Sequence, residues 1–308
     1  MPLTLINHPV YSTRPALARR YPISKYARLM EVLAEDGVFD QCVCHVPEPA
    51  SYADLTRVHD PRYVGRVFAQ TLDPAETRRI GFPLSDPIVY RSRAAAGGTV
   101  LCGRLALEHG LALNTAGGSH HAFADFGAGY CVFNDVAVAA RALQAEGRVG
   151  QVLVVDLDVH QGDGTAAIFA DDPSVFTFSI HCQDNFPARK QTSDLDVGLA
   201  AGTGDDGYLS ALDTHLDRVI EAVAPDLVFY NAGVDPHAED RLGRLALTDA
   251  GLAARDAMVL GACLRRRVPL ACVLGGGYSD DLDCLAKRHA ILYKTALAFA
   301  SAPGSIGA

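Results

Sequence analysis

The chain has 308 residues, 49% of them hydrophobic and 20% charged, so it can bury one large core and lacks the composition of a disordered protein. Its formal net charge of -9 argues against a nucleic-acid partner, because nucleic-acid binders normally carry a basic face or stripe. No stretch approaches the roughly 18 apolar residues that a membrane span needs, and the N-terminal segment lacks an apolar signal core. We therefore expect a cytoplasmic protein with no nucleic-acid or membrane partner.

From residue 92 onward, stretches with helical periodicity alternate with short apolar runs that are typical of buried strands. Strands that alternate with helices predict a parallel sheet covered by helices on both faces. No internal repeat and no linker divides the chain, so we expect a single domain over residues 1–308. The expected elements, in chain order, are a helix near 92–109, a strand at Leu111–Asn114, a helix near 133–146, strands at Gln151–Asp156 and Val175–Ile180, a helix near 206–223, a strand at Leu227–Asn231, a helix near 248–265, a strand at Pro269–Leu274 and a helix near 282–299.

Polar and glycine-rich segments follow four of these predicted strands. In parallel sheets the ligand site forms beyond the carboxyl ends of the strands, so side chains in these segments are expected to converge on one pocket. The four segments are Gly117–His121, Asp156–His160, Gly233–Asp235 and Gly275–Tyr278.

The segment Asp156–His160 carries polar residues at every second position. While the chain stays extended, Asp156, Asp158 and His160 would therefore point to one side. Two carboxylates this close need a cation, and a set of Asp, His and a remote Asp235 suits zinc with open positions for water and substrate. Asp156 is a fourth possible ligand. The alternative, solvated or helix-capping carboxylates, suits an acid such as Asp163 or Asp172 better than this pair.

Tandem histidines, His120 and His121, follow two glycines and supply imidazoles that titrate near neutrality. Each imidazole needs a carboxylate or carbonyl to fix its tautomer, and Asp156 and Asp163 are the acids available at that end of the sheet. Two His–Asp pairs beside a metal are therefore expected. Single histidines such as His59 are expected to be structural or surface residues.

Tyr278 follows three glycines at a predicted strand end. A loop at that position can bring the phenol hydroxyl into the pocket as a hydrogen-bond donor to an oxyanion. A packed aromatic side chain explains the same pattern equally well, and the local sequence does not choose between the two.

Taken together, these blocks resemble the histone deacetylase superfamily from His8 to about Tyr293. The matching blocks are Gly117–Ala122, Gly129–Asp135, Val155–Gly164, Tyr230–Asp235 and Gly275–Tyr278. Three further segments are most similar to class IV, the histone deacetylase 11-type group and its bacterial relatives: Asp240–Gly243, Arg255–Asp256 and Arg266–Pro269.

The resemblance implies the α/β arginase/deacetylase fold: one domain of three layers, whose central, mostly parallel sheet has about eight strands flanked by helices. It implies a zinc-dependent hydrolase that removes an acyl group, acetyl or longer, from N-acyl-lysine in a peptide or protein, or from a related small N-acyl amine. Zinc would be bound by Asp158, His160 and Asp235.

By the same resemblance, His121 paired with Asp163 would act as general base and then acid, His120 paired with Asp156 as an electrostatic helper, and Tyr278 as donor to the acyl oxygen. A structural potassium ion would be held by Asp156, Asp158, Ser179 and the carbonyls of His160 and Ile180. A second potassium site would use carbonyls of Phe169, Asp172 and Val175. The substrate channel would be lined by Gly129, Tyr130 and Phe186, with Leu242 at its rim.

Three alternative functions are weighed against this one. A ureohydrolase of the arginase type needs two manganese ions and a second Asp-rich cluster, whereas the last block here offers only Asp235 followed by Pro236 and His237. An inactive acyl-lysine-binding module would be expected to lack a ligand, a tandem histidine or the tyrosine, and all are present. An acetylpolyamine deacetylase would keep an acid seven residues after the last ligand, where this chain has Leu242, which disfavours a polycation.

Overall fold

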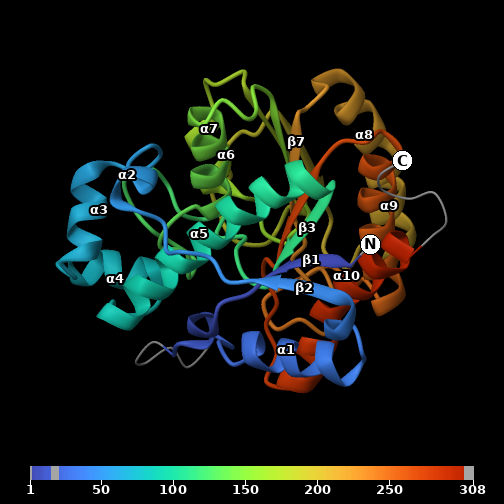
Figure 1. Cartoon of the computed structure of the whole chain (residues 1–308), viewed down its shortest axis with the longest axis horizontal. Coiled ribbons are helices and arrows are strands. Elements are labelled where there is room, and N and C mark those ends of the chain that lie inside the picture. Colours follow the sequence, from blue (N-terminus) through green and yellow to red (C-terminus); the bar gives the residue numbers. More distant parts are fainter. Residues whose placement is uncertain (1, 15–20, 302–308) are drawn as a thin grey trace.

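The computed structural model describes residues 2–14 and 21–301, and its centre is one eight-stranded sheet (Figure 1). The strand order is β2-β1-β3-β8-β7-β4-β5-β6, and every pairing of neighbouring strands is parallel. The strands are β1 (Leu3–Ile6), β2 (Cys42–His45), β3 (Leu111–Asn114), β4 (Val152–Asp156), β5 (Val175–Cys182), β6 (Leu195–Leu199), β7 (Leu227–Asn231) and β8 (Leu270–Val273).

Helices cover both faces of the sheet. One apolar cluster joins the sheet to α1 (Lys25–Glu35), α8 (Asp205–Val223), α9 (Asp249–Arg265) and α10 (Leu282–Ser301). A second cluster, on the other face, joins it to α5 (Asp86–His109), α6 (Asp135–Ala145) and α7 (Asp163–Phe169). The short helices α2 (Tyr52–Leu55), α3 (Pro61–Phe68) and α4 (Pro74–Ile80) lie together at one side of the molecule, away from α8 and α9 (Figure 1). Two 3-10 helices, η1 (Pro9–Ser12) and η2 (Phe39–Gln41), complete the elements of the described chain.

The central strands are largely apolar up to their carboxyl ends because both of their faces are covered. In β4, Val152 and Val154 pack in the cluster with α5 and α6, whereas Leu153 and Val155 pack in the cluster with α8 and α9. Successive side chains of a strand point to opposite faces, so a strand buried on both faces reads as a continuous apolar run.

The expected three layers and eight strands are confirmed, and the sheet is wholly parallel. Each element expected after residue 92 is present within a few residues of its predicted bounds, and α5 begins earlier, at Asp86, with a proline in its first turn. No element was predicted before residue 92, so strands β1 and β2 and helices α1 to α4 are additions of the structure, as are β6 and α7 further along the chain. The predicted single domain, 1–308, includes residues outside the described ranges. Part of the N-terminal segment on which the cytoplasmic prediction rests also lies outside them.

The topology places four loops at one edge of the sheet. Strands β3, β8, β7 and β4 are consecutive neighbours and run in the same direction, so the segments that follow them leave the sheet side by side. Within the described part of the chain, no helix combines the length and apolarity needed to cross a bilayer.

Candidate active site

The side chains of Asp158, His160 and Asp235 form a buried cluster beyond the ends of β4 and β7, and their ligand atoms all lie within 4.8 Å of one another. His160 Nδ1 is 3.0 Å from Asp158 Oδ1 and 3.2 Å from Asp235 Oδ2. This is the only cluster of metal-ligand side chains found among the described residues. Asp156 lies outside the cluster, so the extended geometry that would have made it a fourth ligand ends with β4.

The cluster fits zinc in its spacing and its chemistry. Tetrahedral zinc with bonds of about 2.0–2.1 Å places neighbouring ligand atoms about 3.3 Å apart, close to the separations found here. Asp235 Oδ2 is buried and accepts no hydrogen bond from a described residue. Burial and the neighbouring charge of Asp158 raise the pKa of Asp235 to about 7, which shows that the site disfavours a second carboxylate without a cation. A site of this kind calls for a divalent ion.

Backbone groups from neighbouring loops hold the ligands in place. The amide of Val159 donates to Asp235 Oδ1 at 2.9 Å, which ties the β4 loop to the β7 loop. The amide of Gly276, after β8, donates to Asp158 Oδ2 at 2.7 Å. A Cβ atom at Gly276 would lie 2.1 Å from Asp235 Oδ2, so a side chain at this position would intrude on the ligand cluster.

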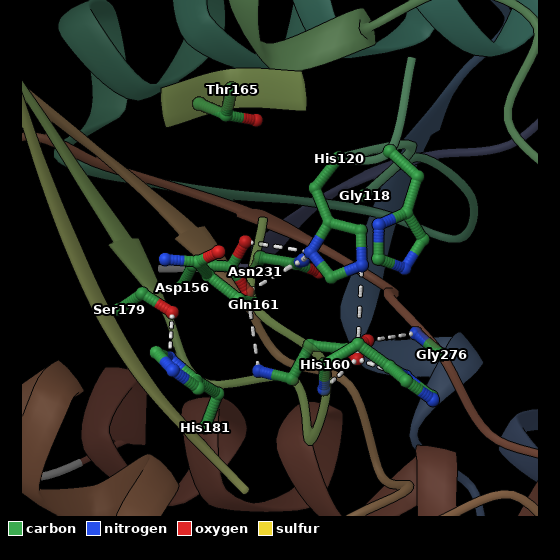
Figure 2. Close-up of polar contacts among 12 residues, drawn as sticks. Gly118, His120, Asp156, His160, Gln161, Thr165, Ser179, His181, Asn231 and Gly276 are labelled. Atoms are coloured by element: carbon green, nitrogen blue, oxygen red, sulfur yellow. Dashed lines mark hydrogen bonds and ion pairs between the residues drawn. The ribbon is translucent and has the colours of Figure 1, made fainter. Parts of the chain in front are cut away.

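The tandem histidines each contact a different carboxylate. His120 Nδ1 lies 2.7 Å from Asp156 Oδ2, and His121 Nδ1 lies 2.6 Å from Asp163 Oδ1. The two imidazole centroids are 4.1 Å apart, and that of His121 is 5.7 Å from the His160 ring. Figure 2 shows His120 directed toward Asp156 on one side and toward the loop of His160 on the other. Both expected His–Asp pairs are therefore present in the geometry.

The two imidazoles differ in their protonation. Burial lowers the pKa of His120, but the charges of Asp156 and Asp158 outweigh it and raise the value to about 9. Burial and the adjacent His120 lower the pKa of His121 to about 4, although the hydrogen bond and charge of Asp163 act to raise it. Near neutral pH, His121 is thus an imidazole with one nitrogen able to accept a proton.

The loop that carries the histidines is fixed by Asp135 at the start of α6. Its carboxylate accepts hydrogen bonds from the amides of Gly118 and Ser119, at 3.1 and 2.7 Å, and from the Thr99 hydroxyl at 2.6 Å. Gly118 has φ of +82°, and a Cβ atom there would lie 2.5 Å from Asn231 Oδ1. Only glycine fits this close approach at a positive φ.

Tyr278 reaches the cluster from the loop after β8, with its ring 6.3 Å from that of His160. No hydrogen bond joins its hydroxyl to a described residue, although its ring is partly buried. Burial raises the pKa of Tyr278 well above the ordinary value, and the nearby Asp235 adds to the effect, so the hydroxyl keeps its proton. Of the two interpretations of Tyr278, the geometry favours a donor directed into the site.

Asp240 holds the Tyr278 loop, a role that the sequence alone did not reveal. Its Oδ2 accepts from the Tyr278 amide at 2.6 Å, and its Oδ1 accepts from the amides of Leu242 and Gly243 at 2.8 and 2.9 Å. The Arg241 amide donates back to the Tyr278 carbonyl at 3.0 Å. The β7 and β8 loops are therefore joined beside the site.

Other contributors carried no signal of their own in the sequence. Asn231 Nδ2 donates to Asp156 Oδ1 at 2.9 Å and orients the partner of His120 (Figure 2). The buried Lys25 ammonium donates to the carbonyls of Gly275 and Gly277, both at 3.3 Å, and fixes the segment before Tyr278. Asn231 is the last residue of strand β7, and Lys25 lies far from the site in the sequence, so only the folded chain reveals their contacts.

A cavity of about 420 Å³ leads from the surface to His121, His160 and Tyr278. The four residues predicted for the substrate channel all line it: Gly129, Tyr130, Phe186 and Leu242. The ring of Phe186 is 48% exposed and stands edge-on to His121, with centroids 4.8 Å apart. A smaller cavity of about 40 Å³ lies deeper, lined by Lys25 and Arg91 together with His120 and Tyr278.

The residues predicted for potassium also lie together. Ser179 on β5 is paired in register with Asp156 on β4, and Ile180 is the next residue of β5. The Ser179 hydroxyl lies 3.0 Å from His181 Nδ1 (Figure 2). In the second set, the amide of Asp172 donates to the Phe169 carbonyl at 3.0 Å, and that of Val175 to the Asp172 carbonyl at 3.2 Å. The potassium ions themselves stay a prediction.

Comparison with known proteins gives consistent results. Residues 20–292 match the histone deacetylase domain family. The chain is 50% identical over 296 residues to an uncharacterised protein of Picosynechococcus, covering 96% of this chain and 99% of that protein. It is 31% identical to histone deacetylase 2 of Arabidopsis thaliana, over 87% of this chain and 74% of that one. The HD domain of HDA15 has the same fold, with a TM-score of 0.82 at 23% identity, covering 97% of this chain and 90% of that chain. The chain therefore belongs to the histone deacetylase family.

Proposed function

We propose that the protein is a zinc-dependent deacylase that hydrolyses an N-acyl amine, with acyl-lysine as the model substrate. The observation that carries this proposal is the convergence of Asp158, His160 and Asp235 with two His–Asp pairs and the Tyr278 hydroxyl at the end of one cavity. Membership of the histone deacetylase family, with deacetylases among its relatives, supports the same reaction.

The ligands Asp158, His160 and Asp235 would hold zinc, which when bound polarises the acyl carbonyl and lowers the pKa of a water molecule toward about 7. His121 would take a proton from that water, since burial keeps its imidazole neutral and Asp163 orients it through Nδ1. It would then return the proton to the leaving amine. His120, held by Asp156, would contribute positive charge beside the reacting carbonyl.

Tyr278 would stabilise the negative charge that develops on the acyl oxygen. Its hydroxyl keeps its proton and has no described partner, and Tyr278 lines the cavity, as an oxyanion donor must. Asp240 and Lys25 hold its loop through backbone contacts, so the donor is positioned before the substrate binds.

A short acyl group, acetyl foremost, fits the deep cavity best. A buried water occupies about 10–15 Å³ on the same measure, so a cavity of about 40 Å³ has room for about three waters. Lys25 and Arg91 line it, and burial of a long hydrocarbon chain against two cations would be unfavourable. This observation favours acetyl over the longer acyl chains that class IV membership would allow.

Three further assignments belong to the same proposal. We propose that potassium occupies the sites of Asp156, Asp158, His160, Ser179 and Ile180, and of Phe169, Asp172 and Val175. We also propose class IV membership, on the segments that resemble that group, and a cytoplasmic location. Flame photometry of dialysed protein would test the first of these.

Metal analysis combined with an acyl-lysine assay tests the function. We expect one zinc per chain, hydrolysis of an acetyl-lysine peptide, loss of turnover on chelation and recovery when zinc is restored. Two manganese ions with urea release from a guanidine would instead identify a ureohydrolase. Metal-loaded protein that binds acetyl-lysine peptides without hydrolysing them would identify a binding module and contradict the proposal.

A further inference from the structure

The outer end of the 420 Å³ cavity carries three arginines, Arg78, Arg79 and Arg244. Asp184 is the only acid among the described residues that line this cavity. All three arginines are exposed, and none forms an ion pair with a described residue. The whole chain has a net charge of -9, so this local excess of positive charge runs against the composition of the rest of the molecule.

The positions of these arginines are fixed relative to the channel wall. Arg78 and Arg79 occupy the last turn of α4, where the Arg79 carbonyl accepts from the Gly129 amide at 3.1 Å and the Ile80 carbonyl from the Tyr130 amide at 2.8 Å. The Arg79 guanidinium lies 4.5 Å from the centre of the Phe126 ring, a packing that leaves its edges able to donate. The α4 end is therefore attached to Gly129 and Tyr130, and its arginines move with the channel.

Arg244 lines the same cavity from the loop between β7 and α9, two residues after Leu242. Its Nη1 donates to the Asp184 carbonyl at 3.3 Å, and no hydrogen bond to a described residue occupies the other guanidinium nitrogens. Arginines from helix α4 and from the loop between β7 and α9 thus line one cavity. A guanidinium presents a planar fork of donors that matches carboxylate and phosphate groups.

The direction of substrate entry decides which part of a substrate meets this rim. The acyl carbonyl must reach Tyr278 and the ligand cluster at the deep end, so the amine side of the substrate points outward. We propose that the arginine rim, formed by Arg78, Arg79 and Arg244, selects N-acyl amines that carry a carboxylate or phosphate group on their amine side, and that it disfavours polyamines and peptides rich in lysine or arginine. This inference rests on the proposed deacylase function and adds its substrate class.

Matched peptides test the inference. Acetyl-lysine would be flanked by aspartate, by asparagine or by arginine on both sides in otherwise identical pentapeptides, and kcat/KM would be measured with zinc-loaded protein. We expect the aspartate peptide to exceed the arginine peptide by about tenfold or more, mainly through KM, and the preference to weaken as salt rises. Small substrates would be compared in the same way: Nε-acetyl-lysine, which has a free carboxylate, would be measured against its C-terminal amide and against N-acetylputrescine.

Variants then assign the preference to the rim. Replacement of all three rim arginines with glutamine should reduce the aspartate-to-arginine ratio to near one, while kcat on the asparagine peptide changes little. The matched control is Arg218→Gln, since Arg218 is exposed on α8, whose C-terminal end leads into the opposite end of β7. An unchanged ratio in the triple variant, or equal kcat/KM for the three peptides in the wild type, would overturn the inference.

A binding measurement separates this inference from the proposed function. Fluorescence anisotropy of labelled aspartate and arginine peptides reports on the rim whether or not the peptides are hydrolysed. Preferential binding of the aspartate peptide without turnover would support the rim and contradict the deacylase, whereas turnover of all peptides with equal binding would support the deacylase and contradict the rim.

Discussion

At the scale of single residues, the reaction depends most directly on the Tyr278 hydroxyl. We predict that Tyr278→Phe folds and binds zinc normally but lowers kcat at least about a hundredfold, because removal of one oxyanion donor typically costs about 3–4 kcal/mol of transition-state stabilisation. Steady-state kinetics with an acetyl-lysine peptide, together with zinc content, would measure this. Near-normal turnover in the variant would contradict the role of Tyr278.

Asp240 is expected to act on the rate through Tyr278. Asp240→Ala leaves the Tyr278 amide without its 2.6 Å partner and releases the loop that holds the hydroxyl, so we predict a fall in kcat of about tenfold or more with a smaller change in KM. A loss of stability alone would reduce the amount of folded protein but would not change kcat of the molecules that remain folded. The matched control is Asp280→Asn, whose carboxylate is 86% exposed and pairs with Arg241 at the surface. Equal kcat in both variants would remove Asp240 from the positioning of the site.

At the scale of elements, the ends of β4 and β7 are joined by the fully buried Arg255 on α9. Its guanidinium donates to the carbonyls of Leu157 and Gly233, at 3.3 and 2.6 Å, one in each of the loops that carry metal ligands. It also pairs with the buried Asp256 at 2.8 Å. Helix α9 thus holds both ligand loops in place through the Arg255 side chain.

We predict that Arg255→Met lowers the free energy of unfolding by about 3–5 kcal/mol, because it leaves Asp256 as a buried charge without its cation and the Gly233 carbonyl without its donor. The double variant Arg255→Met with Asp256→Leu should regain part of this loss. Urea unfolding of the metal-loaded protein would measure both. If the single and double variants were equally destabilised, the loss would have to come from the carbonyls alone.

At the scale of the whole molecule, buried neutral histidines are expected to make the fold sensitive to acid. Burial lowers the pKa of His59 to about 4, while its Nε2 accepts from the Asn134 amide at 3.0 Å and its Nδ1 lies 2.9 Å from the Phe123 carbonyl. Burial also lowers the pKa of His289 well below its usual range. The prediction that His59 is a structural histidine agrees with these contacts.

Because the folded state binds the proton of His59 more weakly than the unfolded state, its contribution to stability is complete above about pH 6.5 and is lost as the pH falls toward 4. The shift corresponds to at most about 3 kcal/mol. We predict that the free energy of unfolding falls between pH 7 and pH 4.5, and that it falls less steeply in His59→Gln. Urea unfolding at several pH values would show this, and identical slopes in the two proteins would contradict it.

Much of the fold could be predicted because the central strands are buried on both faces. Strands β3, β4, β7 and β8 have no exposed position, so their apolar runs stand out from the helical periodicity around them. The edge strands β2 and β6 contain exposed positions and so lack the burial on both faces that makes the central strands distinctive. Helix α7 has seven residues, too few to show a period.

The sequence by itself determined the central strands, the strand ends that carry the chemistry and the identity of the candidate ligands, because these depend on side-chain types and periods within one segment. The tertiary structure decided which groups meet. It joined Asp240 to the Tyr278 loop and Arg255 to two ligand loops, and it brought three arginines from α4 and a distant loop to one cavity. Contacts of this kind depend on packing between segments far apart in the chain, and no local pattern encodes them.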